Sequence, residues 1–289
     1  MPSRLALTIV AATLTACAEP AAKPAVKAEP TPGHASAKLE PATPATTGAK
    51  RSTYSQCNVA GPFIAITFDD GPHGANTPRL LKMLKDRGIK ATFFVVGQCV
   101  AELPEIAKQI VDEGHEIANH SWSHPLLTKL GEGSVRDQIE RTHNVIRQTT
   151  GAVPTLFRPP FGAFTANQRA WAHATLAYTS ILWDVDSNDW KHRSAAKTES
   201  IIRAETRPGS IILCHDIHTP TIDAMPATLD ALLGKGFKFV TVSQLLAMHV
   251  EKPPAPKAPP AKPIPAKDAA DAASSPDQQQ SASPAPAKP

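Results

Sequence analysis

The stretch Ile64-Ala65-Ile66-Thr67-Phe68-Asp69-Asp70-Gly71-Pro72 decides where this chain places its first predicted strand and its first reactive groups. A short apolar run closed by Gly71-Pro72 is typical of a buried strand that ends in a turn. Side chains alternate between the faces of a strand, but the turn can bring the carboxylates of Asp69 and Asp70 towards one pocket. A solvated turn could also carry this pair. The pair favours a site where one carboxylate holds a metal and the other handles a proton.

A second motif, His120-Ser121-Trp122-Ser123-His124-Pro125, places two imidazoles four positions apart. Residues 115–119 are predicted to form a short strand, and Pro125 disfavours the helical conformation at His124, so the pair is expected on a loop at a strand end. Alone, it could be a chance pairing or two hydrogen-bonded surface histidines. Together with Asp70 it offers two nitrogens and one oxygen and leaves coordination positions open. That donor set is typical of a catalytic metal site and suggests hydrolysis.

The pattern between the two ends of the chain alternates strands with helices, and roughly 190 residues suffice for one well-buried domain. Short strands are predicted at 63–68, 91–96, 115–119, 155–157, 179–183, 210–213 and 238–240. Amphipathic helices are predicted at 77–87, 104–113, 135–149 and 195–206. A parallel barrel and an open doubly wound sheet would both gather the polar motifs at the carboxyl ends of the strands.

Three further motifs make the sequence recognisable: Arg158-Pro159-Pro160-Phe161-Gly162, Asp189-Trp190 at the end of residues 183–190, and Leu213-Cys214-His215-Asp216. With the aspartate and histidine pairs, the chain resembles the polysaccharide deacetylases, the NodB-homology or carbohydrate esterase family 4 domain. The five motifs occur in the order of that family, and the resemblance covers about residues 60–250. It implies an α/β fold, an irregular (β/α) barrel.

The resemblance also implies a role for each motif residue. Asp70, His120 and His124 would be the metal ligands, and Asp69 the general base that takes a proton from the attacking water. Arg158 would pair with this base and hold it ionised, because a guanidinium is permanently charged. The alternative for Arg158 is an ordinary surface ion pair.

The remaining motif residues are expected to act on the leaving group and the acetyl group. Phe161 stands where relatives usually carry tyrosine, and its backbone N–H is expected to face the developing oxyanion. His215 would be the general acid that protonates the leaving amine, and Asp189 would orient it and favour its charged form. Trp190 and Leu213 are expected to form the apolar pocket for the acetyl methyl group, although both residue types are more often core residues.

Two nearby aspartates, Asp184 and Asp186, could compete with Asp189 for His215. The cofactor implied is one divalent metal ion, with zinc as the first expectation and cobalt, nickel or manganese as alternatives.

The expected function is removal of N-acetyl groups from N-acetylglucosamine-containing polysaccharide, with release of acetate. Peptidoglycan is the first choice of substrate, followed by chitin-like oligosaccharide or poly-N-acetylglucosamine. Two alternatives are kept: a non-catalytic sugar-binding or structural cell-envelope lipoprotein on the same fold, and an acetylxylan esterase that uses the same site on an ester bond.

The start of the chain resembles a bacterial lipoprotein signal. Residues 5–16 are apolar but too short to span a bilayer, and Leu14-Thr15-Ala16-Cys17 places a cysteine at the cleavage point. Residues 1–17 are therefore expected to be a signal peptide whose Cys17 is lipidated, giving an exported, membrane-anchored lipoprotein that faces the periplasm or cell envelope. A secreted soluble protein is the alternative, because small residues before position 17 also suit ordinary cleavage.

The flanks differ in composition from the middle of the chain. Residues 18–53 are rich in Ala, Pro and Lys and residues 251–289 in Pro and Ala, and both are expected to be disordered, the first as a tether and the second as a tail. The catalytic domain is therefore expected at 54–250. The formal net charge of +4 is mild and gives no nucleic-acid signature.

The cysteines leave an odd number once Cys17 is lipidated, so at most one internal disulfide is expected. Cys214 is expected to be a buried free thiol, and Cys57 with Cys99 is the first pair to test for a bridge.

Overall fold

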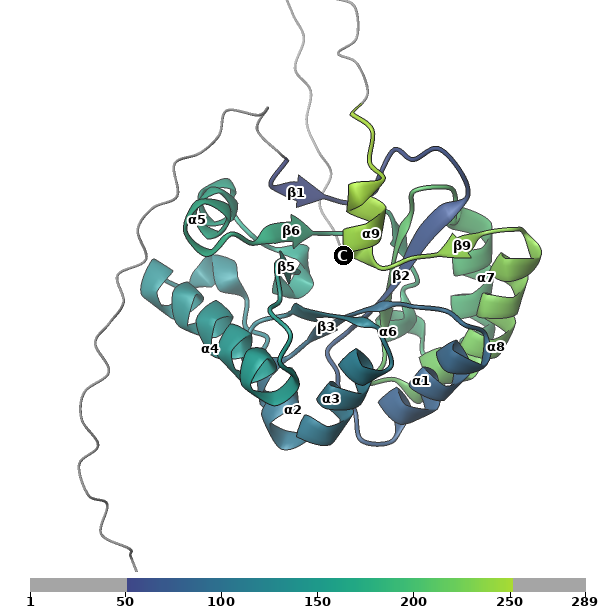
Figure 1. Ribbon diagram of the computed structural model, residues 1–289, viewed down its shortest axis with the longest axis horizontal. Coiled ribbons are helices and arrows are strands. Elements are labelled where there is room, and N and C mark those ends of the chain that lie inside the picture. The colour runs from purple at the N-terminus through teal and green to yellow at the C-terminus, as the bar shows by residue number, and fades with distance from the viewer. Residues whose placement is uncertain (1–50, 252–289) are drawn as a thin grey trace, which may run out of the picture. The chain divides into compact units, whose positions relative to one another are not determined.

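The computed structural model describes residues 51–251 (Figure 1). Its strands, in chain order, are β1 (Thr53–Tyr54), β2 (Phe63–Asp69), β3 (Thr92–Val95), β4 (Glu116–Asn119), β5 (Leu156–Phe157), β6 (Thr179–Ile181), β7 (Val185–Asp186), β8 (Ile211–His215) and β9 (Lys238–Phe239). Its α-helices are α1 (Asn76–Asp86), α2 (Gly97–Glu102), α3 (Pro104–Asp112), α4 (Glu132–Thr150), α5 (Ala166–Leu176), α6 (Asp189–His192), α7 (Ala195–Glu205), α8 (Thr219–Gly234) and α9 (Val242–Ala247).

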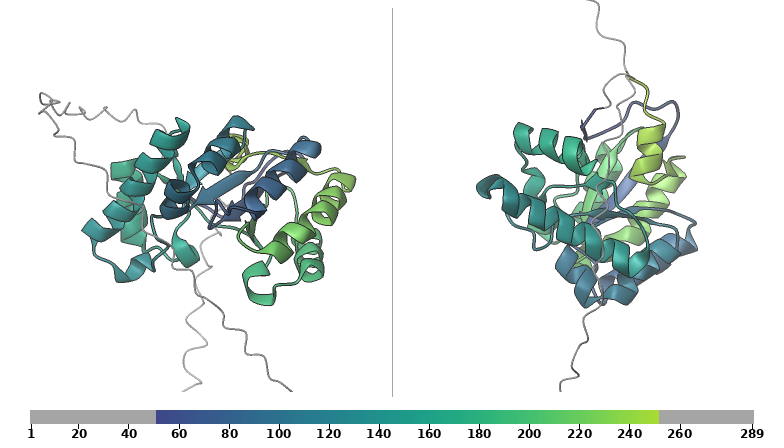
Figure 2. Two further views of the ribbon diagram at one scale, coloured as in Figure 1. Left: turned by 90° about the horizontal axis from the view of Figure 1, so that it is seen from below. Right: turned by 60° about the vertical axis from the view of Figure 1, so that its left-hand side comes forward.

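The strands form one curled sheet in the order β1-β6-β5-β4-β3-β2-β8-β7, and β9 pairs with the start of β2. Every ladder between the named strands is parallel. In the left view of Figure 2, the teal helices α4 and α5 and the yellow-green helix α8 lie on opposite sides of the strands. The sheet is a half-barrel rather than a flat doubly wound sheet, so the predicted irregular (β/α) barrel is confirmed.

The two faces of β2 show why this strand is central. Ile64, Ile66 and Phe68 pack in one apolar cluster with residues of α1 and α8, including Leu80 and Leu229. The burial of this layer is what holds the helices on the outside of the sheet, because apolar area removed from water stabilises the fold.

Ala65, which alternates with those residues, faces the inside of the half-barrel with Phe94, Ala118 and Ile181. Helix α9 supplies Val242 and Leu245 to this inner cluster. The apolar residues therefore fill the interior below the carboxyl ends of the strands and leave those ends to polar groups.

The register of the sheet aligns the ends of its strands. Asp69 pairs with His215 across β2 and β8 and with Phe94 across β2 and β3. Asn119, the last residue of β4, pairs with Phe157, the last residue of β5. Because the strands are parallel, the residues that follow them meet at a single edge.

All the predicted strands and helices are present, with ends shifted by a few residues. The additional long helix α8 was not predicted, because it carries Pro220 and Pro226 and is largely apolar. It packs against both α1 and α7, so apolar residues occupy more than one side and the amphipathic period is weak. Strands β1 and β7, of two residues each, were also not predicted, whereas the equally short β5 and β9 lie within the predicted runs 155–157 and 238–240.

The pair left open by the sequence, Cys57 with Cys99, is not bridged, since Cys57, Cys99 and Cys214 are all free. Cys57 lies in the inner cluster and its N–H donates to Gly209 O, whereas Cys99 lies on α2, which packs against α3 and α4. The two thiols belong to different layers of the fold. Cys214 is a buried free thiol, as expected.

The predicted ends of the chain are largely outside the described residues. These are the signal peptide with Cys17, residues 18–50 of the tether and residues 252–289 of the tail. Strand β1 begins at Thr53, one residue before the predicted domain start, and Val250 N–H donates to Asn58 O. Within residues 51–251, none of the helices has the length and apolar character needed to cross a membrane.

Gly209 should be irreplaceable because two backbone segments approach it closely. Its φ is 86°, its N–H donates to Phe63 O, and a Cβ atom would lie 1.8 Å from Cys57 O. Gly151 is a matched control, with φ 76° and no atom within 4 Å of its Cβ position. We expect Gly151→Ala to lower the free energy of unfolding by about 1–2 kcal/mol, and Gly209→Ala by about 4 kcal/mol or more, because backbone must move. Denaturant titration of both variants measures this, and equal losses would contradict it.

Candidate active site

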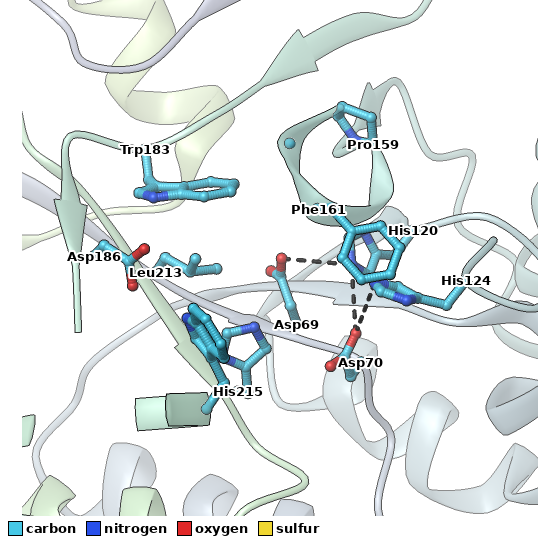
Figure 3. Close-up of a pocket in the computed structure, with 12 residues that line it drawn as sticks. Asp69, Asp70, His120, His124, Pro159, Phe161, Trp183, Asp186, Leu213 and His215 are labelled. Atoms are coloured by element: carbon cyan, nitrogen blue, oxygen red, sulfur yellow. Dashed lines mark ion pairs between the residues drawn. The ribbon is translucent and has the colours of Figure 1, made fainter. Parts of the chain in front are cut away.

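The carboxylates of Asp69 and Asp70 line the same cavity, although they are neighbours at the end of β2 (Figure 3). Asp70 has a φ of 73°, so the chain leaves the strand conformation between the two residues. The turn that follows is held by Val96 N–H, which donates to Gly71 O, and by His73 N–H, which donates to Thr77 Oγ1. The left-handed backbone conformation of Asp70 ends the strand, so the side chains of Asp69 and Asp70 no longer have to point to opposite faces.

The cavity has a volume of about 490 Å³ and lies at the carboxyl ends of the strands. The residues that line it come from every motif of the sequence: Asp69, Asp70, His120, His124, Pro159, Phe161, Gly162, Trp183, Asp186, Trp190, Leu213 and His215.

Three side chains converge in this cavity as a candidate metal centre. Asp70, His120 and His124 each offer one atom, and these atoms lie within 4.8 Å of one another. The distance from Asp70 Oδ1 is 3.4 Å to His120 Nε2 and 3.5 Å to His124 Nε2. Figure 3 shows both imidazoles turned towards the Asp70 carboxylate.

The protonation states of these groups fit a divalent cation. His120 Nδ1 lies 2.7 Å from Arg158 O, and a carbonyl can only accept, so Nδ1 carries the proton and Nε2 is free to bind. Burial lowers the pKa of His124 and so favours its neutral form, which can bind a cation. Asp70 Oδ1 is buried without a hydrogen-bond partner, an arrangement that a bound cation would satisfy. Burial raises the pKa of Asp70, but the neighbouring imidazoles outweigh it and hold this pKa below its usual range.

The loop that carries the histidines is anchored through its backbone. Trp122 N–H and Ser123 N–H both donate to Gln138 Oε1 on α4, at 2.9 and 3.0 Å. Ser121 and His124 have φ values of 69° and 55°, so neither is in a strand or a helix. The loop is therefore held in shape by specific hydrogen bonds.

Arg158 binds Asp69 deep in the protein. Arg158 Nη1 donates to Asp69 Oδ1 at 2.6 Å and to Thr67 Oγ1 at 2.7 Å, and the arginine has no exposed surface. The guanidinium carbon lies 4.0 Å from the ring centre of Phe94. Burial lowers the pKa of Arg158, while the Asp69 carboxylate opposes this. The surface alternative for this pair is excluded by its burial.

A second buried pair lies on the other side of Asp69. His215 Nδ1 is 2.7 Å from Asp189 Oδ1, and Asp189 Oδ2 accepts hydrogen bonds from His215 N–H and Thr221 Oγ1. Burial lowers the pKa of His215, but the hydrogen bond and charge of Asp189, with the charges of Asp69 and Asp70, raise it to about 9. Because Nδ1 is engaged, Nε2 is the free atom of this imidazole.

The structure also decides among the three aspartates near His215. Asp184 accepts hydrogen bonds from Ser210 Oγ and from Ile211 N–H, away from His215. Asp186 accepts one from Asn188 N–H and lines the cavity. Asp189 is therefore the partner of His215, as the resemblance implied.

Aromatic side chains form the rim of the cavity. Phe161 has a φ of 59° and a side chain that is 66% exposed, with its ring centre 4.6 Å from that of His124. Trp190 is half-exposed, and Leu213 is buried in the wall. Sequence reasoning missed Trp183 as a cavity residue and considered Asp186 only as a competing partner of His215. The register between β7 and β8 places Asp186 opposite Leu213 and so beside the cavity, but this register cannot be known before the strand pairing.

Comparisons with known proteins show the family of this chain. The sequence model of the family described as polysaccharide deacetylase matches residues 57–180. A peptidoglycan-N-acetylglucosamine deacetylase of Bacillus cereus is 37% identical over 203 residues, which are 67% of this chain and 73% of that protein. This chain belongs to the polysaccharide deacetylase family.

Two further comparisons define the extent of the similarity. The peptidoglycan-N-acetylglucosamine deacetylase of Listeria monocytogenes is 41% identical over 182 residues. That match covers 63% of this chain, and the chain spans only 38% of the length of the Listeria protein. A crystal structure of a peptidoglycan N-acetylglucosamine deacetylase is 34% identical, with a TM-score of 0.66, and covers 70% of this chain and 96% of its own.

Metal binding should depend on the carboxylate of Asp70 and not on every carboxylate of the cavity. Asp70→Asn removes the anionic ligand, and we expect the zinc dissociation constant to rise by at least about 100-fold. Asp186→Asn is the matched control, because Asp186 lines the same cavity outside the three-residue cluster. Competitive zinc titration of metal-depleted protein measures both constants. Equal affinities for the two variants would remove Asp70 from the ligand set.

Proposed function

We propose that this protein is a metal-dependent hydrolase that removes N-acetyl groups from N-acetylglucosamine-containing polysaccharide and releases acetate. The observation that carries the proposal is that one cavity is lined by the three-residue metal cluster and by one member of each of two separate pairs, Asp69–Arg158 and His215–Asp189. Hydrolysis of an amide requires a base for water and an acid for nitrogen, and these two pairs have those properties.

The metal centre accounts for part of the chemistry. A divalent cation held by Asp70, His120 and His124 would polarise the acetyl carbonyl and make water acidic near neutral pH. We propose zinc as the first choice, because two imidazoles and a carboxylate with open positions are its common catalytic donor set, and cobalt, nickel and manganese as alternatives.

Asp69 is proposed as the general base. Its Oδ1 is bonded to Arg158, while Oδ2 points to the ligand cluster and lies 3.6 Å from His120 Nε2. Oδ2 would accept the proton of the water that attacks the carbonyl carbon. Arg158 supplies the counter-charge of this carboxylate and fixes its orientation.

His215 is proposed as the general acid. Its free Nε2 would give a proton to the nitrogen as the carbon–nitrogen bond breaks, so that amine and acetate leave. Asp189 orients the ring and stabilises its protonated form. We propose the backbone N–H of Phe161 as an oxyanion donor, and Trp190 with Leu213 as the walls for the acetyl methyl group.

Peptidoglycan is the proposed substrate, followed by chitin-like oligosaccharide or poly-N-acetylglucosamine. The support is that the Bacillus, Listeria and crystal-structure relatives are all named for peptidoglycan N-acetylglucosamine. A non-catalytic sugar-binding protein is disfavoured because base, acid and ligand residues are all present in the cavity. An acetylxylan esterase would use the same residues and is an outcome of the test below.

We propose that the protein is exported and anchored in a membrane through lipidated Cys17, with the alternative of a secreted soluble enzyme. The support is the sequence Leu14-Thr15-Ala16-Cys17 alone. Mass spectrometry of the mature N-terminus tests it, and an unmodified first residue would leave the secreted alternative.

The activity should require Asp69 without requiring it for metal binding. We expect wild type to release acetate from peptidoglycan fragments and to lose this activity reversibly with a chelator. Asp69→Asn keeps an oxygen for Arg158 but cannot take a proton, so kcat should fall by about 10²–10⁴ while zinc stays bound. Acetate assays on peptidoglycan fragments, chitin oligomers and acetylated xylan, with elemental analysis, measure this. Full activity of metal-free protein would overturn the mechanism, and turnover of xylan alone would favour the esterase.

The dependence of the rate on pH should report the contact between His215 and Asp189. The protonated imidazole is the acid, so activity is lost as the pH rises through its pKa. Asp189→Asn removes the hydrogen bond and charge that raise this pKa to about 9, so the alkaline limb should move to lower pH. Asp186→Asn leaves His215 untouched and should keep the limb in place. A pH profile of kcat/KM for metal-saturated enzyme checks both, and an unmoved limb in Asp189→Asn would exclude His215 as the acid.

A further inference from the structure

A chain of buried hydrogen bonds reaches the metal loop from outside the cavity, and it begins at the amide of Asn119. This residue is fully buried and immediately precedes the ligand His120. Asn119 Oδ1 accepts from Ser121 N–H at 2.9 Å, and Asn119 Nδ2 donates to Ile139 O at 2.9 Å and to Tyr178 Oη at 3.0 Å. Both hydrogens of the amide are therefore used, and its orientation is fixed by its partners.

Ser121 transmits this contact to a metal ligand. It is fully buried, and its φ of 69° is a conformation that a residue with a Cβ adopts only when its surroundings impose it. Its Oγ accepts from His124 N–H at 3.1 Å, and its carbonyl accepts from Gly97 N–H at 3.0 Å. Movement of Ser121 would therefore displace the backbone of His124.

Tyr178 lies at the other end of this series of hydrogen bonds. It lies just before β6, is 3% exposed, and its ring packs in an apolar cluster with Phe157 and Phe164. Its hydroxyl accepts from Asn119 and lies 2.9 Å from His143 Nδ1. Because Asn119 Nδ2 can only donate, the hydroxyl proton of Tyr178 goes to His143 Nδ1, which accepts as a neutral imidazole. Each polar group in this series of hydrogen bonds then has a partner.

We infer that Tyr178 is a positioning residue for the metal-binding loop, acting through Asn119 and Ser121 on His124. The inference rests on the metal centre of the proposed function and adds a residue that lies outside the five motifs. Without the hydroxyl, one N–H of the buried Asn119 amide has no partner. An unpaired buried donor favours rotation of the amide, which would weaken the Asn119–Ser121 bond that holds the left-handed conformation.

Tyr178→Phe tests this inference because it removes only the hydroxyl and keeps the packed ring. The chain offers a matched control in Tyr54→Phe, since Tyr54 is the other tyrosine and lies on β1, where its ring contacts His249. In metal-depleted full-length protein, amide hydrogen exchange at Ser121 should be at least about fivefold faster in Tyr178→Phe than in wild type. Tyr54→Phe should leave this exchange unchanged.

Zinc titration of the same proteins provides the second measurement. We expect the zinc dissociation constant to rise about three- to tenfold in Tyr178→Phe and not in Tyr54→Phe, below the 10–100-fold typical of residues that contact a ligand directly. Restoring saturating zinc should restore kcat, with KM unchanged. Unchanged exchange at Ser121, or an unchanged zinc affinity, would overturn the inference. Failure of wild type to bind zinc, cobalt, nickel and manganese alike would instead overturn the metal centre of the proposed function, and the exchange measurement on metal-free protein would still decide the role of Tyr178.

Discussion

The buried guanidinium of Arg158 is the constraint on which the rest of the site depends. It binds Asp69 and Thr67 of β2, and its remaining donors reach Ile181 O of β6 and Leu182 O, at 3.3 Å each. The carbonyl of the same residue fixes the tautomer of His120. One side chain and its backbone thus join the proposed base, the metal cluster and two distant strands.

Burying this charge is favourable only because its partners are complete. Removing one partner from a buried ion pair costs about 3–5 kcal/mol, since the other charge is left without water or a counter-ion. The ring of Phe94 under the guanidinium adds a favourable face without adding a competing acceptor. Asp69 is therefore confined to one orientation, with one oxygen held by Arg158 and the other directed to the cavity.

The functional side chains leave the strands at residues with unusual backbone conformations. Within residues 51–251, seven residues other than glycine have a positive φ, and five of these are Asp70, Ser121, His124, Phe161 and Asn188. Each lies in or directly beside a motif of the site, and each such conformation costs about 1–2 kcal/mol. The hydrogen bonds of Gln138, Asn119 and Thr77 to the neighbouring turns offset that cost. The fold thus uses polar contacts to hold a strained but well-defined edge above an apolar interior.

The sequence by itself determined the alternation of strands and helices, the family, and the five motifs that contribute to the cavity. These follow from local information: apolar runs that end at Gly71-Pro72, histidines at a fixed spacing, and motifs in a fixed order. Strand β7 and helix α8 escaped, because β7 contains a single apolar residue and the exposed face of α8 mixes Ala227 and Leu233 with its acidic residues, so its period is weak.

Only the tertiary structure decided which groups meet. The sequence does not distinguish among Asp184, Asp186 and Asp189 as partners of His215. The choice of Asp189 depends on the α6 turn and on the register between β7 and β8. The same holds for the separation of Cys57 from Cys99, for Trp183 in the cavity wall, and for the contact of Tyr178 with Asn119 across 59 positions. Such contacts join residues distant along the chain, and their geometry is set by strand order and helix packing, which no local pattern encodes.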